Sequence, residues 1–145
     1  MISESNIAYI AGLFDGEGCV QIKRYKEKKK KHTGKGYRVS NSMRISMEIT
    51  MTDESVIRWV HEILKVGSVN KKPKSGFRKN GTRYLLQWRW RCTFRDAYYV
   101  ARLLWPYAQV KLQGIEKIMD HYAPDYIFED KVVSLQQYKE AMSLE

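Results

Sequence analysis

The sequence contains little cysteine, little proline and no long hydrophobic run. Its 145 residues include 2 Cys and 3 Pro. Cys19 and Cys92 stand far apart and outside any CxxC pair, which argues against a zinc site or a disulfide framework and favours reduced thiols. No apolar run approaches the roughly 20 residues that cross a bilayer, and residues 1–4 lack the basic segment that opens a signal peptide. We therefore expect a soluble, intracellular protein that is not secreted, from the cytoplasm of a prokaryote or a phage-infected cell, or from an organelle.

Acidic residues are also scarce. The chain has 26 Lys and Arg against 16 Asp and Glu, a formal net charge of +10. The imbalance is uneven, because residues 1–122 contain 24 bases and 11 acids, whereas residues 123–145 contain 2 bases and 5 acids. Basic side chains can serve solubility alone, but here they alternate with strand patterns and aromatic residues. This arrangement favours a polyanionic partner, nucleic acid, bound by the basic part of the chain.

The length and the hydrophobic periodicity predict one domain over residues 1–145, with a core region 5–122 and a helical tail 123–145. Helices are expected at 5–15, 52–65, 95–104, 111–122 and 131–142, and strands at 18–26, 37–51, 68–74 and 83–94. The first helix is expected to begin at a cap on Ser5 or Asn6 and to end at Gly16. Two hairpins followed by helices predict an α+β fold with a mixed or antiparallel four-stranded sheet and helices on one face.

Alternation along these strands separates an apolar face from a polar, basic one. The residues expected on the apolar face are Val20, Ile22, Tyr37, Val39, Met43, Ile45, Met47, Ile49, Met51, Leu86, Trp88, Trp90 and Cys92. Side chains of the polar face can hydrogen-bond to base edges and phosphates. The residues expected to contact DNA are Gln21, Lys23, Tyr25, Arg38, Ser40, Ser42, Arg44, Ser46, Glu48, Ser68, Asn70, Lys72, Gln87, Arg89 and Arg91. A plain solvated face is the alternative for any one of them, but the whole set at strand periodicity favours a groove of duplex DNA.

The C-terminal end of the first helix carries acids, which is the charge that electrostatics disfavours there. The stretch Ile10-Ala11-Gly12-Leu13-Phe14-Asp15-Gly16-Glu17-Gly18 runs from an apolar helix into two acids, although a helix C-terminus favours cations. One face of this helix has small side chains that allow a second helix to approach closely. That face consists of Ala8, Ala11, Gly12 and Asp15. A helix that is merely buried on all sides is the alternative interpretation.

This stretch resembles the motif of the LAGLIDADG homing endonucleases, and the predicted order αββαββα is the fold which that resemblance implies over residues 5–122. The chain contains one copy of the motif. The resemblance therefore implies a homodimer in which two motif helices pack at a two-fold axis through the small-residue face. Two sheets would form a saddle over a near-palindromic DNA target.

The resemblance also implies the chemistry. Glu17, with the backbone carbonyl of Gly16, would bind divalent metal at the phosphodiester, and Asp15 would close the junction between the helices. The metal would be Mg²⁺, with Mn²⁺ as a substitute, and Ca²⁺ would support binding without cleavage. Pro106 to Lys111 resembles a family segment ending in a lysine, which implies that Lys111 polarises water or the phosphate; a phosphate clamp or a plain surface charge are alternatives for it. Cleavage of both strands would leave 3′ overhangs.

One position departs from the resemblance. Relatives often place a polar side chain beside the metal at the end of the second strand, where this chain has Thr50 and Met51. Either the water network differs there or Thr50 takes that place. Two other functions stay open at this point: an RNA maturase that assists intron splicing, and a DNA-binding relict without catalysis.

Overall fold

The computed structural model describes residues 2–31, 34–72 and 76–122. In chain order the elements are α1 (Glu4–Glu17), β1 (Gly18–Lys30), β2 (Tyr37–Met51), α2 (Glu54–Leu64), β3 (Ser68–Lys72), β4 (Gln87–Thr93), α3 (Phe94–Leu104) and α4 (Leu112–Tyr122). The predicted helix 131–142 and the remainder of the tail lie outside the described residues. The order of elements up to residue 122 is the predicted one. No helix among the described residues is long and apolar enough to cross a membrane.

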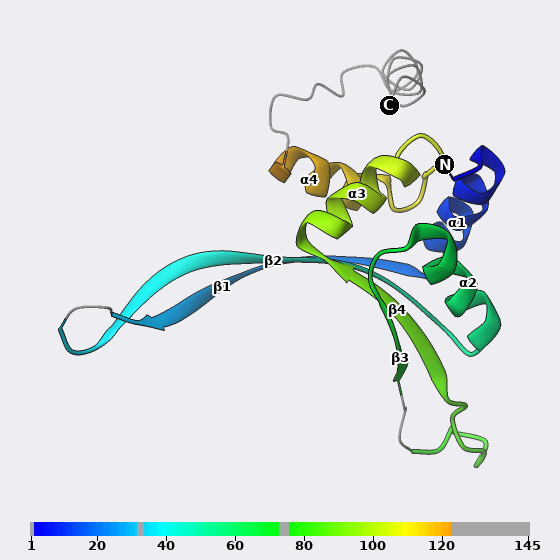
Figure 1. The fold of residues 1–145 in the computed structure, drawn as a ribbon. Coiled ribbons are helices and arrows are strands. Elements are labelled where there is room, and N and C mark those ends of the chain that lie inside the picture. The colour runs from blue at the N-terminus through cyan, green and yellow to red at the C-terminus, as the bar shows by residue number, and fades with distance from the viewer. Residues whose placement is uncertain (1, 32–33, 73–75, 123–145) are drawn as a thin grey trace.

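The four strands form one sheet in the order β1-β2-β4-β3, and all neighbouring strands are antiparallel. The helices lie together on one face of the sheet, and the β1–β2 hairpin projects well beyond them (Figure 1). The α+β prediction is confirmed, and the sheet is antiparallel rather than mixed. We call the helix-covered side and its continuation along the hairpin the back face, and the opposite side the front face.

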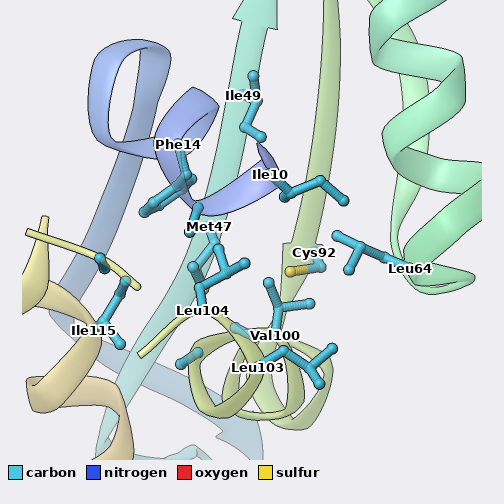
Figure 2. Close-up of a cluster of buried hydrophobic side chains, with 14 of the residues drawn as sticks. Ile10, Phe14, Met47, Ile49, Leu64, Cys92, Val100, Leu103, Leu104 and Ile115 are labelled. Carbon is cyan, nitrogen blue, oxygen red and sulfur yellow. The ribbon is translucent and has the colours of Figure 1, made fainter. Parts of the chain in front are cut away.

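The core lies between the helices and the back face of the sheet. Ile10 and Phe14 of α1, Met47 of β2 and Leu104 of α3 are completely buried there and converge with side chains from the other helices (Figure 2). Each large apolar side chain buried in this way stabilises the fold by about 1.5–3 kcal/mol. The core therefore fixes α1 against the sheet, and with it the position of the two acids at the end of α1.

Both ends of α1 differ from prediction. The helix begins at an N-cap on Ser3, whose hydroxyl accepts a hydrogen bond from the backbone N–H of Asn6 at 3.2 Å. Gly16 does not end the helix, which continues through Glu17 to a C-cap at Gly18. Gly18 leads directly into β1, and a side chain there would lie 2.2 Å from the ring of Phe14. The glycine that the packing requires is therefore Gly18.

Three strand predictions are also corrected. β1 extends beyond the predicted end at residue 26 to Lys30, because residues 27–30 also pair with β2, as far as Lys30 opposite Tyr37. Tyr37 and Val39 are on the predicted face but stay 66% and 53% exposed, since they lie on the hairpin beyond the helices. β4 begins at Gln87 rather than residue 83, and Leu86 is 43% exposed.

Candidate functional site

The register of the sheet places all the predicted contact residues on the front face. Directly opposed residues share a face in an antiparallel sheet, and the pairs include Gln21 with Ser46, Lys23 with Arg44, and Tyr25 with Ser42. The same holds across the remaining strands, where Arg91 lies between Glu48 and Ser68. The front face is therefore one continuous polar and basic surface that crosses all four strands.

Side chains of the front face also order one another. The guanidinium of Arg44 lies 5.4 Å from the centre of the Tyr25 ring, and the Ser42 hydroxyl donates to Glu27 at 3.0 Å. Arg89 approaches the Glu48 carboxylate at 4.0 Å. Contacts of this kind hold long side chains in fewer rotamers, which lowers the entropy cost of binding a ligand. The front face is thus partly preorganised for contact with a polyanion.

Ser46 is the exception on this surface. It is only 1% exposed, and its hydroxyl lacks a hydrogen-bond partner among the described residues. A covered hydroxyl is not available to touch a ligand, so the prediction of a direct contact by Ser46 is corrected. Buried Nε atoms of Arg89 and Arg91 on the same face are likewise unpartnered within the described chain.

Sequence reasoning missed further residues of this face. Cys19, Glu27 and Lys29 alternate with the back-face positions in the same way and lie opposite the predicted residues Glu48, Ser40 and Arg38. Lys29 pairs with Glu27 at 3.5 Å, so one acid on the hairpin is neutralised within the surface. The period of two that identified the other residues is the signal that would have found these.

The two acids at the end of α1 have different surroundings. The carboxylate of Asp15 accepts hydrogen bonds from the backbone N–H of Gln109 at 2.9 Å and of Lys111 at 3.0 Å. It thereby ties α1 to the segment that leads into α4. Bonds to a charged acceptor are among the stronger ones in proteins. Asp15 is therefore a structural anchor within the chain, and its oxygens are already engaged.

Glu17 has the opposite character. Its side chain is exposed, and no hydrogen bond or ion pair engages it within residues 2–31, 34–72 and 76–122. Gly16 beside it is exposed as well. The described residues contain no group of three or more His, Cys, Asp or Glu that could bind a metal by themselves. A cation at Glu17 would therefore need oxygen ligands from outside this part of the chain.

The bonds to Asp15 also position Lys111. This lysine is half-buried and immediately precedes α4, and its backbone is bonded to the residue two positions before Glu17. Lys111 and Glu17 thus approach the same end of α1 from segments nearly a hundred residues apart. At the end of β2, Thr50 lies on the front face opposite Arg89, whereas Met51 packs against the core. Because Gly18, the residue after Glu17, pairs with Ile49, Thr50 is the polar residue at the end of β2 where α1 leads into β1.

The small-residue face of α1 is divided between two environments. Ala11 is fully buried in the chain's own core and has no surface left for a second copy. Ala8 is half-buried and Gly12 is exposed. No atom of the described residues lies within 4 Å of a Cβ built on Gly12 or on Gly16. The half-buried Ala8 and the exposed Gly12 and Gly16 are four positions apart and lie on one side of the helix.

The described chain combines two features: acids and glycines at the end of an N-terminal helix, and two antiparallel strand pairs after it. The family model described as LAGLIDADG endonuclease matches residues 10–86, more than half of the chain. The chain belongs to the LAGLIDADG endonuclease family.

Solved structures share the fold. The homing endonuclease I-CvuI, in complex with the I-CreI target, superposes with a TM-score of 0.54 at 17% identity, over 97% of this chain and 82% of I-CvuI. The homing endonuclease I-LtrWI, bound to target DNA, superposes with a TM-score of 0.53 at 18% identity, over 90% of this chain and 42% of I-LtrWI. I-AabMI, a LAGLIDADG meganuclease bound to uncleaved DNA, superposes with a TM-score of 0.52 at 18% identity, over 92% of this chain and 43% of I-AabMI.

Proposed function

We propose that the protein is a site-specific endonuclease that hydrolyses both strands of a long, near-palindromic DNA target. The observation that carries the proposal is the exposed carboxylate of Glu17, which no group of the described residues engages and which stands where the core-anchored helix α1 leads into β1. A preorganised basic surface can hold a duplex, and an unengaged acid at its edge can hold a cation against a phosphate. The solved relatives I-CvuI, I-LtrWI and I-AabMI were crystallised with DNA.

The second half of the site would come from a second copy of the chain. Ala8, Gly12 and Gly16 offer a strip on which a helix can pack closely, because no side chain fills the space at either glycine. A two-fold axis through this strip would bring two copies of Glu17 together and set two front faces end to end. The DNA target would then repeat its half-sites with the same symmetry.

The residues present fit a hard divalent cation such as Mg²⁺. Glu17 supplies an exposed carboxylate, the Gly16 carbonyl supplies a backbone oxygen, and both donor types suit that ion. A bound cation activates water and relieves charge on the leaving oxygen. The I-CvuI complex was crystallised in the presence of 2 mM Mg with its DNA not cleaved. In our proposal Mn²⁺ replaces Mg²⁺, and Ca²⁺ supports binding without cleavage.

Lys111 would act on the phosphate and Thr50 on the water. A lysine ammonium near the cleaved bond stabilises the negative charge that develops there and orients a water by donating to it. Thr50 offers a hydroxyl on the same side of the sheet. With Glu17 at the two-fold axis, the two cuts would lie across the minor groove and leave 3′ overhangs.

Cleavage of duplex DNA that spans the uninterrupted locus of the gene tests this function, together with a library of randomised near-palindromic duplexes. We expect cut ends with 3′ overhangs that depend on Mg²⁺, stop on addition of a chelator, and share two-fold related half-sites. DNA that is bound but never cut would contradict the endonuclease and favour the relict. Binding of the intron RNA with no cleavage of DNA would favour the maturase.

A further inference from the structure

The β1–β2 hairpin is basic on its back face as well as on its front face. Beyond the helices, alternate residues of β1 on the back face are Arg24, Lys26, Lys28 and Lys30, and all four are exposed. Their partners on β2 are Met43, Asn41, Val39 and Tyr37. None of these eight described residues is an acid, so four cations form an uncompensated row on the back face of the hairpin. The hairpin itself projects beyond the helices (Figure 1).

The two faces of the hairpin differ in chemistry. The front face combines cations with serine hydroxyls, a Tyr25–Arg44 stack and one acid, Glu27. Such groups discriminate between base edges. The back face carries three lysines and one arginine, and lysine is a point charge that binds phosphate without a directional pattern. The back face is therefore suited to a phosphate backbone of any sequence.

Exposed apolar groups accompany the back-face cations. Tyr37 is 66% exposed and Val39 is 53% exposed, so the Tyr37 ring is accessible to a ligand. Nearer the helices, a hollow of about 490 Å³ is lined by Arg24, Lys26, Asn41 and Met43 together with Tyr25 and Ser42. A row of cations beside an aromatic ring is the arrangement by which proteins hold unpaired bases, because the ring stacks on a base while the cations follow its backbone.

We propose that the back face of the β1–β2 hairpin is a second nucleic-acid site, which binds a single-stranded polynucleotide while the front face holds duplex DNA. Alternate residues of a strand are about 6.6–6.8 Å apart, a spacing of the same order as that between successive phosphates of an extended single strand. Arg24, Lys26, Lys28 and Lys30 bind successive phosphates, and Tyr37 stacks on a base. A duplex cannot stack on Tyr37, because its bases are already paired and stacked.

Lysines on a strand at the edge of a sheet have another known use, since they discourage pairing with a second sheet. β1 is such an edge strand. That role requires charge but neither an exposed tyrosine nor any preference for the back face. A comparison of two sets of variants on the same hairpin separates the two roles.

The back-face set replaces Arg24, Lys26, Lys28 and Lys30 by Gln. The matched front-face set replaces Lys23, Lys29, Arg38 and Arg44 by Gln, which removes the same charge from the same hairpin. Fluorescence anisotropy of the full-length chain measures binding of three labelled probes: a 20-nucleotide oligouridine, a 20-nucleotide oligothymidine and a mixed-sequence duplex of the same length. The two single strands distinguish RNA from DNA as the source of the ligand.

We expect the back-face set to weaken single-strand binding at least tenfold and to leave duplex binding within about twofold. The salt slope for single strands should fall by as much as about 3, at roughly 0.7 for each phosphate that the variant no longer neutralises. The front-face set should do the reverse. If both sets weaken both ligands equally, or if the back-face set only causes aggregation, the second site does not exist.

Two further measurements test stacking and independence. Tyr37→Leu should weaken single-strand binding severalfold without changing the salt slope, because stacking involves no counterion. Oligouridine should also bind protein already saturated with duplex, with little change in affinity. Complete competition between the two ligands would show that they share the front face and would overturn the inference. The duplex arm reports on the proposed endonuclease surface separately.

Discussion

Asp15 and Glu17 are two residues apart and have different functions. Asp15 is engaged by two backbone N–H groups, whereas Glu17 is exposed and unengaged within the described chain. The resemblance placed Asp15 at a junction between two motif helices, whereas the bonds that the structure shows for it lie within one chain. The partners of Asp15 were beyond sequence reasoning, because they are 94 and 96 positions away and are backbone groups that any residue provides.

The anchor at Asp15 predicts a cost in stability. Asp15→Asn keeps the size of the side chain but leaves one of the two N–H groups without an acceptor and removes the charge. We expect the free energy of unfolding to fall by about 2 kcal/mol, as for other bonds to charged groups. Urea denaturation measures it, with Glu17→Gln as the control that should unfold as the wild type does. Equal stability of both variants would contradict the anchor.

The buried thiol of Cys92 is expected to make the free energy of unfolding depend on pH. Burial, with the nearby carboxylate of Asp96, raises the pKa of this thiol from 9.0 to about 12. Above pH 9 the unfolded chain therefore releases a proton that the folded chain keeps until about pH 12. The contribution of Cys92 is complete below pH 9 and is lost as the pH rises through that window. Cys92→Ala should flatten this part of the stability curve; an unchanged slope would refute the assignment.

Among the elements, helix α1 has the apolar face that its sequence predicts but ends at a different residue. Ile7, Ile10 and Phe14 follow the i, i+3, i+7 spacing of an apolar helix stripe, and all three are buried. The end of the helix was predicted incorrectly, since Gly16 and Gly18 both look like helix stops and only the position of the Phe14 ring distinguishes them. Ala11 was assigned to a partner helix although it lies in the core, because small residues suit both environments.

Gly18 should tolerate no side chain. A Cβ there would lie 2.2 Å from Cδ2 and 2.5 Å from the carbonyl oxygen of Phe14, and the latter is backbone that cannot rotate away. We expect Gly18→Ala to lower the free energy of unfolding by about 3 kcal/mol, at the upper end of overpacking costs. Gly16→Ala is the matched control, because no atom of the described chain lies within 4 Å of a Cβ there, and both variants are compared in the Gly12→Leu background so that only the monomer is measured. Thermal unfolding that shows the two variants equally stable would contradict this packing.

Gly12 is expected to affect dimer formation but not the folding of the monomer. No atom of the described chain lies within 4 Å of a Cβ at Gly12, so Gly12→Leu should leave the folded monomer intact. On a closely packed two-fold interface the same side chain would separate the helices. We expect sedimentation of the wild type as a dimer at micromolar concentration and of Gly12→Leu as a monomer. A wild-type monomer, or a dimeric variant, would contradict the interface.

At the scale of the whole molecule, alternation along strands predicted the sheet faces better than the strand ends. Every predicted front-face position lies on that face, because a period of two persists wherever a strand forms. The lysine-rich end of β1 was expected as a loop, since pairing with β2 is a tertiary effect that local composition does not report. The back face of the hairpin was missed for the same reason.

In the proposed function, the exposed carboxylate of Glu17 enables cleavage and the front face provides binding. The most direct measurement compares Glu17→Gln with Glu62→Gln, an equal change at an exposed acid on α2, in Mg²⁺-dependent cleavage and in DNA binding. The account predicts that Glu17→Gln binds DNA within a fewfold of the wild type and cuts neither strand, whereas Glu62→Gln does both normally. Cleavage or nicking by Glu17→Gln at the wild-type rate would contradict it.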